Sequence, residues 1–243
     1  MQCYDLSFND PFKNLLFDEI LLDEAEKGQG GEVLRLWESP VPFIVLGRVC
    51  RIEENVIAEA VCRDGVPVLR RCSGGGTVLQ GPGCLNFSLI LSKQRPGLQQ
   101  IHRSYRYVLD LIAEALIPLG VRAVFRPVCD LAFASSERKF SGNAQRRLRK
   151  FLLHHGTLLY DFDLDLIPRY LRMPPSVPDY RKRRSHRDFV ANLRLERAAL
   201  KRALCACFLS GNQPVHNRLV PVLFSRLKEC VRDRSAAMSV EMH

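Results

Sequence analysis

The sequence has no long apolar run. Its longest predominantly apolar stretches, 43–47 and 85–91, are the length of a strand, whereas a membrane-spanning helix needs about 20 apolar residues. The first residues, Met1 to Asp5, lack the basic and then apolar order of a secretion signal. We therefore expect a cytoplasmic protein without membrane insertion.

Paired cysteines are also missing. Nine cysteines are scattered along the 243 residues, but no two of them form a Cys-x-x-Cys pair. Their spacing argues against a zinc site and against a thioredoxin-like motif. In a reducing compartment we expect most of them to be small buried hydrophobic residues.

Neither common phosphate-binding motif occurs, because the chain has no Gly-x-x-x-x-Gly-Lys-Ser/Thr and no Gly-x-Gly-x-x-Gly between a strand and a helix. A different glycine-rich stretch, Arg70 to Leu79, follows the apolar run 66–69. Its three glycines allow positive φ angles and close approach of a ligand, and successive N–H groups can form an anion site. Arg70 and Arg71 add positive charge beside it. A plain glycine-rich hairpin turn is the alternative.

Three further motifs follow in order, at 85–88 (Leu-Asn-Phe-Ser), 138–145 (Arg-Lys-Phe-Ser-Gly-Asn-Ala-Gln) and 154–159 (His-His-Gly-Thr-Leu-Leu). Together with Arg-Arg-x-Ser-Gly-Gly-Gly, this ordered set resembles the lipoate–protein ligase A family, within the biotin/lipoate protein ligase superfamily. The resemblance covers roughly residues 4 to 195 and is far more specific than any single motif.

Periodicity predicts runs of strands with helices set between them, which favours the α+β class. Helices are expected from Pro11 to about Gly28 and over 55–62, 101–116, 188–208 and 219–231, and a short helix is expected after Leu164. Strands are expected over 33–37, 43–46, 84–91, 121–125, 130–133, 140–147 and 152–160. Alternation in the 84–91 strand predicts that it is half-buried.

The resemblance implies the biotin/lipoate protein ligase fold, which is similar to class II aminoacyl-tRNA synthetases: a mixed, mainly antiparallel sheet flanked by helices. We expect a single catalytic domain over 1–243, with a core at roughly 4–195 and a helical extension at 196–235.

The family's activity, which the resemblance implies here, uses ATP to convert lipoate to lipoyl-adenylate and then transfers the lipoyl group to an acceptor lysine. Lys139 would be the central catalytic residue, touching both the acyl oxygen and the α-phosphate, and Gly142 would allow tight packing around it and the acyl group. The resemblance assigns the nucleotide to Lys139, Arg71, Gly76, Thr77, Val78 and Leu79.

On the same basis, Ser73, Gly74, Gly75 and His155 would border the acyl tunnel. Asp130 would coordinate Mg²⁺ or position Lys139, and a plain strand-initiating aspartate is the alternative. Arg35 and Trp37 match a strand of the family, and there we expect core residues.

The chain departs from the family pattern at Cys84, where an asparagine is usual, and at Gln80 and Cys50. About fifty residues follow the last motif, too few for the family's C-terminal accessory domain. We therefore expect either a separate accessory subunit or a pre-activated acyl donor. The rival activity is an octanoyl or lipoyl transferase with a cysteine thioester, for which Cys84 and Cys129 are the candidates. A biotin ligase is disfavoured, because its Gly-Arg-Gly-Arg loop is absent.

The net charge of +10 arises largely from 146–150, 181–184 and the last third of the chain. The acceptors that the resemblance implies are lipoyl domains of 2-oxoacid dehydrogenase acyltransferase subunits or the glycine-cleavage H protein, which tend to be acidic, and a basic rim would steer them. A nucleic-acid-binding module is the third reading, but the basic runs carry no such motif and few aromatic residues.

Overall fold

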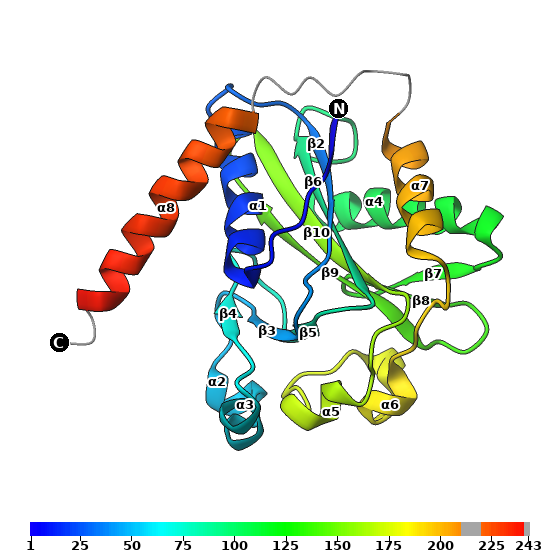
Figure 1. The fold of residues 1–243 in the computed structure, drawn as a ribbon. Coiled ribbons are helices and arrows are strands. Elements are labelled where there is room, and N and C mark those ends of the chain that lie inside the picture. The colour runs from blue at the N-terminus through cyan, green and yellow to red at the C-terminus, as the bar shows by residue number, and fades with distance from the viewer. Residues whose placement is uncertain (210–219, 241–243) are drawn as a thin grey trace.

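The computed structural model describes residues 1–209 and 220–240, and a seven-stranded sheet forms its centre (Figure 1). The first strand pairs in parallel with the second, and every other neighbouring pair in this sheet is antiparallel. The expected mixed, mainly antiparallel sheet is therefore confirmed. In spatial order the strands are β1 (Gln2–Asp5), β2 (Val33–Trp37), β6 (Cys84–Ser92), β10 (Phe151–Leu159), β9 (Lys139–Arg147), β8 (Asp130–Phe133) and β7 (Ala123–Arg126).

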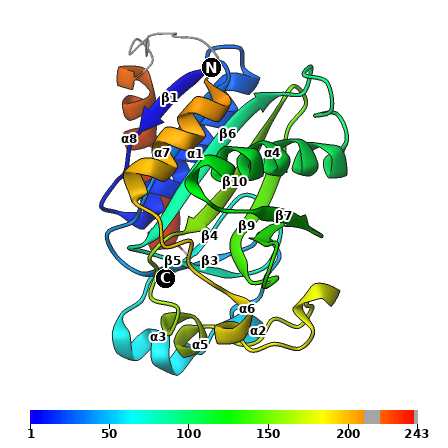
Figure 2. The same cartoon turned by 90° about the vertical axis from the view of Figure 1, so that its right-hand side faces the viewer.

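Helices flank this sheet on both sides (Figures 1 and 2). On one side α1 (Pro11–Glu26) contacts β6 and β10, and α8 (Val220–Val240) packs against α1; on the other, α4 (Ile101–Leu116) and α7 (Arg197–Phe208) pack together. Alternate residues of β2 point to opposite faces of the sheet: Val33 packs in the core under α1, whereas Leu34 and Leu36 pack in the core under α4. None of the helices in the described ranges has the length and apolar character that crossing a membrane requires.

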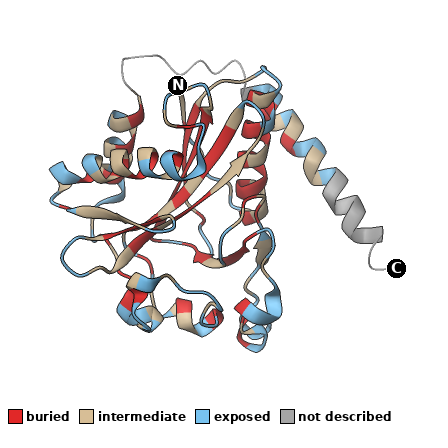
Figure 3. Ribbon diagram, turned by 180° about the vertical axis from the view of Figure 1, so that it is seen from behind, coloured by how far each residue is buried: buried red, intermediate tan, exposed pale blue. Residues whose placement is uncertain are grey.

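A second, three-stranded sheet has the order β4 (Val68–Arg70), β3 (Phe43–Leu46) and β5 (Val78–Gln80). Short helical segments pack near it at one end of the molecule, and their outer surfaces are exposed, whereas the sheets are mostly buried (Figure 3). These segments are α2 (Ile52–Asn55), α3 (Ala58–Asp64), α5 (Leu166–Tyr170), the 3₁₀ turn η2 (Asp179–Arg181) and α6 (His186–Phe189); a further 3₁₀ turn, η1 (Ile117–Leu119), extends α4.

Three local expectations were wrong. Strand β6 is buried from Cys84 to Leu91 rather than half-buried, because helices cover both faces of the sheet at this central strand. The helix expected over 55–62 is split into α2 and α3, because Val56 is extended and bridges to Leu171. The helix expected over 188–208 is interrupted, because α6 ends at Phe189, the backbone after it pairs with the sheet, and α7 begins only at Arg197. Leu219, the expected start of the last helix, lies outside the described residues.

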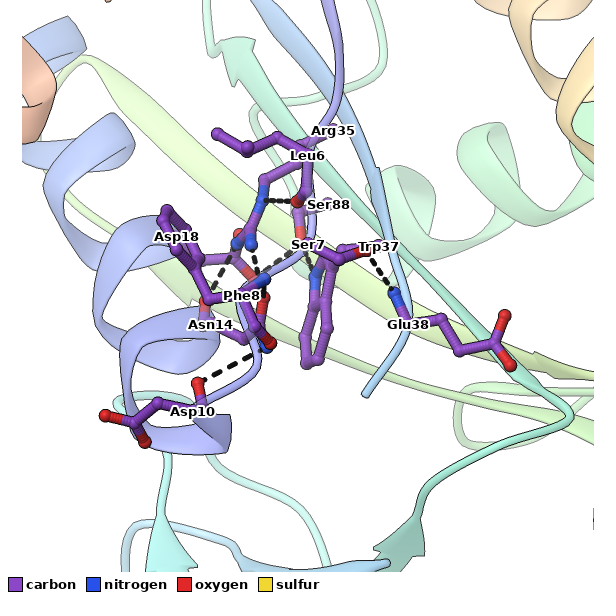
Figure 4. A network of polar contacts seen from close by, with 10 residues as sticks. All are labelled: Leu6, Ser7, Phe8, Asp10, Asn14, Asp18, Arg35, Trp37, Glu38 and Ser88. Atoms are coloured by element: carbon purple, nitrogen blue, oxygen red, sulfur yellow. Dashed lines mark hydrogen bonds and ion pairs between the residues drawn. The ribbon is translucent and has the colours of Figure 1, made fainter. Parts of the chain in front are cut away.

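A buried polar network joins α1 to β2 (Figure 4). The Arg35 guanidinium has no exposed surface and lies 2.6 Å from Asp18 Oδ1. It also donates to the Asn14 carbonyl at 2.8 Å, to Asn14 Oδ1 at 2.7 Å and to the Leu6 carbonyl at 3.1 Å. Trp37 is buried beside it, with 5.2 Å between the guanidinium carbon and the ring centre. The expectation that Arg35 and Trp37 are core residues is therefore confirmed.

Candidate functional site

The glycine-rich loop connects β4 to β5, and the buried Arg71 side chain holds its shape from inside. Arg71 Nη2 donates to the carbonyl oxygens of Gly74 at 2.6 Å and Gly76 at 2.8 Å, and Nε donates to Ser73 Oγ at 3.0 Å. Nη1 donates to the Val45 carbonyl of β3 at 3.3 Å. Because these loop carbonyls need donors, the guanidinium turns toward the loop itself. Its role toward a nucleotide stays a prediction.

Close backbone contact fixes the loop against the segment after β3. A Cβ on Gly47 would lie 1.9 Å from the Gly75 carbonyl oxygen, so only glycine fits there. Gly75 itself has a φ of +86°, in the region that favours glycine. The Arg48 N–H donates to the Ser73 carbonyl at 2.9 Å, and the Cys50 thiol donates to the Gly75 carbonyl at 3.3 Å. The glycines are therefore needed for the packing of this loop.

Part of the loop remains open. Nothing lies within 4 Å of a Cβ built on Gly74 or on Gly76, so both backbones face open space. The Thr77 hydroxyl is buried and has no hydrogen-bond partner. Val78 and Leu79 belong to β5, and the Leu79 side chain is in the core. Open backbone and an unsatisfied hydroxyl are compatible with a polar ligand such as a nucleotide at 74–77, and Val78 and Leu79 would contribute mainly backbone.

His155 on β10 lies beside the loop, and its Nε2 is 2.6 Å from Ser73 Oγ. Burial, the Arg71 charge and the neighbouring His154 lower the pKa of His155 to about 3. The imidazole is therefore neutral at physiological pH, which suits a wall that receives an apolar chain. Ser73 and His155 lie side by side, as the tunnel expectation requires, whereas a slot wide enough for an acyl chain stays a prediction.

Lys139 begins β9, and a carboxylate holds its ammonium group. Lys139 Nζ lies 2.7 Å from Asp130 Oδ1, and the lysine side chain is 26% exposed. The Tyr180 hydroxyl donates to the other oxygen, Asp130 Oδ2, at 2.6 Å. A Cβ on Gly142 would lie 2.9 Å from Lys139 Nζ, so this glycine makes room for the lysine. The Lys139 carbonyl accepts the Ala191 N–H at 2.8 Å, which anchors the strand's first residue.

Both oxygens of the Asp130 carboxylate have partners. They accept hydrogen bonds from Lys139 and Tyr180, so the carboxylate is placed to position the lysine. Within residues 1–209 and 220–240, no group of three or more His, Cys, Asp or Glu side chains could hold a metal ion. A role of Asp130 toward Mg²⁺ stays a prediction.

Cys129 lies beside strand β9, because its carbonyl accepts the Asn143 side-chain amide at 2.8 Å. Burial and the neighbouring Asp130 carboxylate raise the pKa of the Cys129 thiol, and the positive charges of Lys139 and Arg71 oppose that rise. A Cβ on Gly75 would lie 4.0 Å from the Ala144 Cβ of β9, so the loop also touches the lysine strand. The motifs around positions 71 and 139 therefore meet at one place in the fold.

The second candidate thiol lies elsewhere. Cys84 has no exposed surface and packs in the core between β3, α3 and α5. Burial raises its pKa to about 12, so it carries almost no thiolate at neutral pH. Of the two cysteines proposed for a thioester, only Cys129 lies beside Lys139 and is partly exposed.

Two residues of this site were not predicted from the sequence. Tyr180 comes from the basic connector, where nothing in the sequence signalled a contact with Asp130. Asn143 occupies the variable position of the Lys139 motif and donates to the Cys129 carbonyl at 2.8 Å. Its Oδ1 would lie 1.9 Å from a Cβ on Gly156, so the glycine of the His-His-Gly motif makes room for it. An asparagine in the Lys139 motif together with a glycine in the His-His-Gly motif is the sequence feature that could have pointed to Asn143.

Known proteins resemble this chain in sequence and in structure. A family model described as the lipoyl protein ligase A/B catalytic domain matches residues 10–205. A putative lipoate-protein ligase A from Schizosaccharomyces pombe is 32% identical over 203 residues, covering 82% of this chain and 52% of the relative. The octanoyltransferase LipM of Geobacillus kaustophilus is 29% identical over 207 residues, covering 76% of this chain and 73% of LipM. The chain spans about half the length of the ligase relatives that it matches.

Solved structures share the fold. The bipartite lipoate protein ligase of Thermoplasma acidophilum, described with its E2 lipoyl domain, superposes with a TM-score of 0.74 at 22% identity, covering 92% of this chain and 91% of that chain. A lipoate-protein ligase A bound with ATP superposes with a TM-score of 0.71 at 23% identity, covering 92% of this chain and 94% of that chain. At these identities the likeness establishes that the chain has the fold of these lipoate protein ligases.

Proposed function

The chain belongs to the lipoyl protein ligase A/B catalytic domain family, and from this premise we propose that it is a lipoate–protein ligase. It would activate lipoate with ATP and transfer the lipoyl group to a lysine of an acceptor lipoyl domain. One observation supports the proposal: the open glycine-rich loop contacts strand β9, which begins with Lys139, because a Cβ on Gly75 would lie 4.0 Å from the Ala144 Cβ. In this proposal the loop backbone receives an anion and Lys139 supplies a fixed cation, as the joining of a carboxylate to a phosphate requires.

Each part of the site has a defined task in this proposal. Lys139 provides a positive charge where the carboxylate and the phosphate meet, and Asp130 fixes its direction. The nucleotide is bound by Arg71, the Gly76 backbone, the Thr77 hydroxyl and the backbone of Val78 and Leu79, and Arg71 also keeps the loop in shape. ATP supplies the activating group when it is bound.

The acyl side of the site is kept neutral. His155 adds no charge at physiological pH because its pKa lies at about 3. A neutral imidazole beside Ser73 lets an apolar chain bind without desolvating a cation. We therefore assign Ser73, Gly74, Gly75 and His155 to the acyl wall, with Gly142 making room for Lys139.

A second function, octanoyl or lipoyl transfer from a pre-activated donor, draws support from the similarity to LipM and from the position of Cys129. In that reaction the Cys129 thiolate would attack the acyl carbonyl of a carrier thioester and release the carrier thiol; the acceptor lysine amine would then take the acyl group and release the Cys129 thiol. The raised pKa of this thiol in the present arrangement disfavours an attacking thiolate, so we rank ligation first.

The partners follow from the same proposal. Acidic lipoyl domains suit the net charge of +10, and an E2 lipoyl domain accompanies the Thermoplasma ligase. A separate accessory subunit is a further proposal, which the bipartite organisation of that ligase supports.

The deciding experiment supplies purified protein with lipoate and ATP before any acceptor is added, and scores lipoyl-adenylate by mass spectrometry. We expect the adenylate to form, and a lipoyl domain added afterwards to gain the lipoyl mass. The Cys129→Ser variant should behave like the wild type. If acyl transfer needs no ATP and fails in the Cys129→Ser variant, the chain is a transferase instead.

A further inference from the structure

Tyr180 reaches the site from a distant part of the chain. It lies in η2, within the basic connector, about forty residues after Lys139 in the sequence. Its hydroxyl donates to Asp130 Oδ2 at 2.6 Å, whereas Lys139 Nζ contacts the opposite oxygen, Oδ1, at 2.7 Å. Phenol, carboxylate and ammonium therefore form a continuous chain of contacts.

The phenol is held firmly in this position. Its ring packs against Phe189, with 5.2 Å between ring centres. Arg184 Nη2 donates both to the Tyr180 carbonyl at 2.8 Å and to the Glu137 carbonyl at 3.1 Å, which ties the connector to the turn that precedes Lys139. The ring and the backbone of Tyr180 thus have their own contacts, and the hydroxyl is the group that reaches Asp130.

The chemistry of the hydroxyl suits a fixed donor. Burial and the adjacent Asp130 carboxylate raise the pKa of Tyr180, so the phenol stays protonated at neutral pH and can donate. A carboxylate bound through one oxygen can still turn about its last bond, whereas donors on both oxygens fix its plane. The direction in which Asp130 holds the ammonium therefore depends on the Tyr180 hydroxyl.

We propose that Tyr180 is a positioning residue for Lys139 and acts through Asp130. The inference rests on the proposed function, in which Lys139 touches the reacting groups. Removal of the hydroxyl leaves Lys139 chemically intact but less well directed, so it slows acyl transfer without weakening acceptor binding.

The chain offers a matched control for this contact. The Tyr170 hydroxyl donates to Asp64 Oδ2 at 3.0 Å, in a phenol–carboxylate pair that joins α5 to α3. Tyr170→Phe removes the same kind of hydrogen bond as Tyr180→Phe, away from Lys139. Asp130→Asn weakens the Tyr180 link from its other end and serves as a second test variant.

The first measurement needs no substrate. The Lys139 side chain is 26% exposed, so acetic anhydride can reach its amine, and the labelling rate is read by peptide mass spectrometry. We expect labelling of Lys139 to rise about fivefold in Tyr180→Phe, the size of effect that loss of one hydrogen bond produces. It should rise at least as much in Asp130→Asn, which removes the carboxylate charge from Lys139 directly. It should not change in Tyr170→Phe. Unchanged labelling in Tyr180→Phe overturns the proposal.

The second measurement is the kinetics of acyl transfer. In Tyr180→Phe we expect kcat to fall on the order of tenfold to a hundredfold, with an unchanged KM for the lipoyl domain. Faster labelling with an unchanged kcat overturns the positioning role. Should the wild-type protein itself lack ligase activity, the proposed function fails, and the labelling result still decides whether Tyr180 fixes Lys139.

Discussion

Two cation–carboxylate pairs of similar length lie in different surroundings. Arg35 Nη1 is 2.6 Å from Asp18 Oδ1, and both side chains are almost completely buried. Lys139 Nζ is 2.7 Å from Asp130 Oδ1, but the lysine side chain is 26% exposed. The contact distance alone therefore does not tell a structural pair from a site pair.

The two pairs differ in whether the other N–H donors of the cation also have partners. Arg35 donates through all three of its nitrogens, and aromatic rings enclose it. In the described part of the chain, Asp130 is the one ion-pair partner of the Lys139 ammonium, which has three hydrogens to donate. A cation with unused donors and partial exposure can receive a ligand, whereas a saturated and enclosed cation stabilises the fold.

The largest expected effect comes from removing the cation of the buried Arg35–Asp18 pair. Arg35→Met leaves the Asp18 carboxylate buried without its cation, which should lower the free energy of unfolding by about 3–5 kcal/mol. Urea denaturation measures this change. The double variant Arg35→Met with Asp18→Leu should lose less than the single variant, because no unpaired charge remains. A single variant that loses less than about 1 kcal/mol would contradict the structural role.

The partly exposed pair should show a different profile. Lys139→Gln removes the site cation, so we expect acyl transfer to fall by about 10²–10³-fold. The loss of unfolding free energy should be smaller than in Arg35→Met, because Asp130 keeps the Tyr180 donor and the lysine end of the pair is 26% exposed. Lys201 offers a matched control, because its ammonium contacts Asp5 at 2.6 Å with 21% of the side chain exposed. Lys201→Gln should leave transfer unchanged. Equal losses in both variants would argue against a special role for Lys139.

The sequence was sufficient for the elements whose pattern is local. The apolar spacing of 101–116 predicted α4, and the cap Asp10 with Pro11 predicted the start of α1. It failed for the stretch after Asp188, because the Ala191 N–H pairs with the Lys139 carbonyl, a contact that no local pattern encodes. Tertiary pairing overrode helical spacing there.

The same distinction applies to the site. Lys139, Gly142 and the glycine-rich loop stand in contiguous motifs, so the sequence could identify them. The contribution of Tyr180 depends on how the connector folds back, and that placement is visible only in three dimensions. The contacts of Arg71 with the loop carbonyls were likewise not visible in the sequence, whereas its role toward a nucleotide stays a prediction.

The next effect depends on pH and concerns an enclosed histidine near the site. His154 is fully buried, and burial lowers its pKa to about 3. Below about pH 6.5 the imidazole of His154 becomes protonated in the unfolded chain but stays neutral in the folded chain. The free energy of unfolding therefore falls as the pH falls. Between pH 7 and pH 5, His154→Gln should lose about 2 kcal/mol less than the wild type in urea denaturation. A wild-type slope in His154→Gln would disprove the assignment.

The smallest effect is a difference between two serines, one in each region. Ser88 Oγ donates to Asp18 Oδ2 at 2.6 Å, inside the enclosed network, whereas Ser73 Oγ accepts from Arg71 and contacts His155 at the candidate site. Ser88→Ala leaves a buried carboxylate with one donor fewer and should cost about 2 kcal/mol of unfolding free energy. Ser73→Ala should cost only about 1 kcal/mol, because Arg71 keeps its carbonyl partners and the imidazole is neutral. Urea midpoints of the two variants measure the difference, and if Ser73→Ala proves the more destabilising, the glycine-rich loop is part of the stabilising core rather than an open binding element.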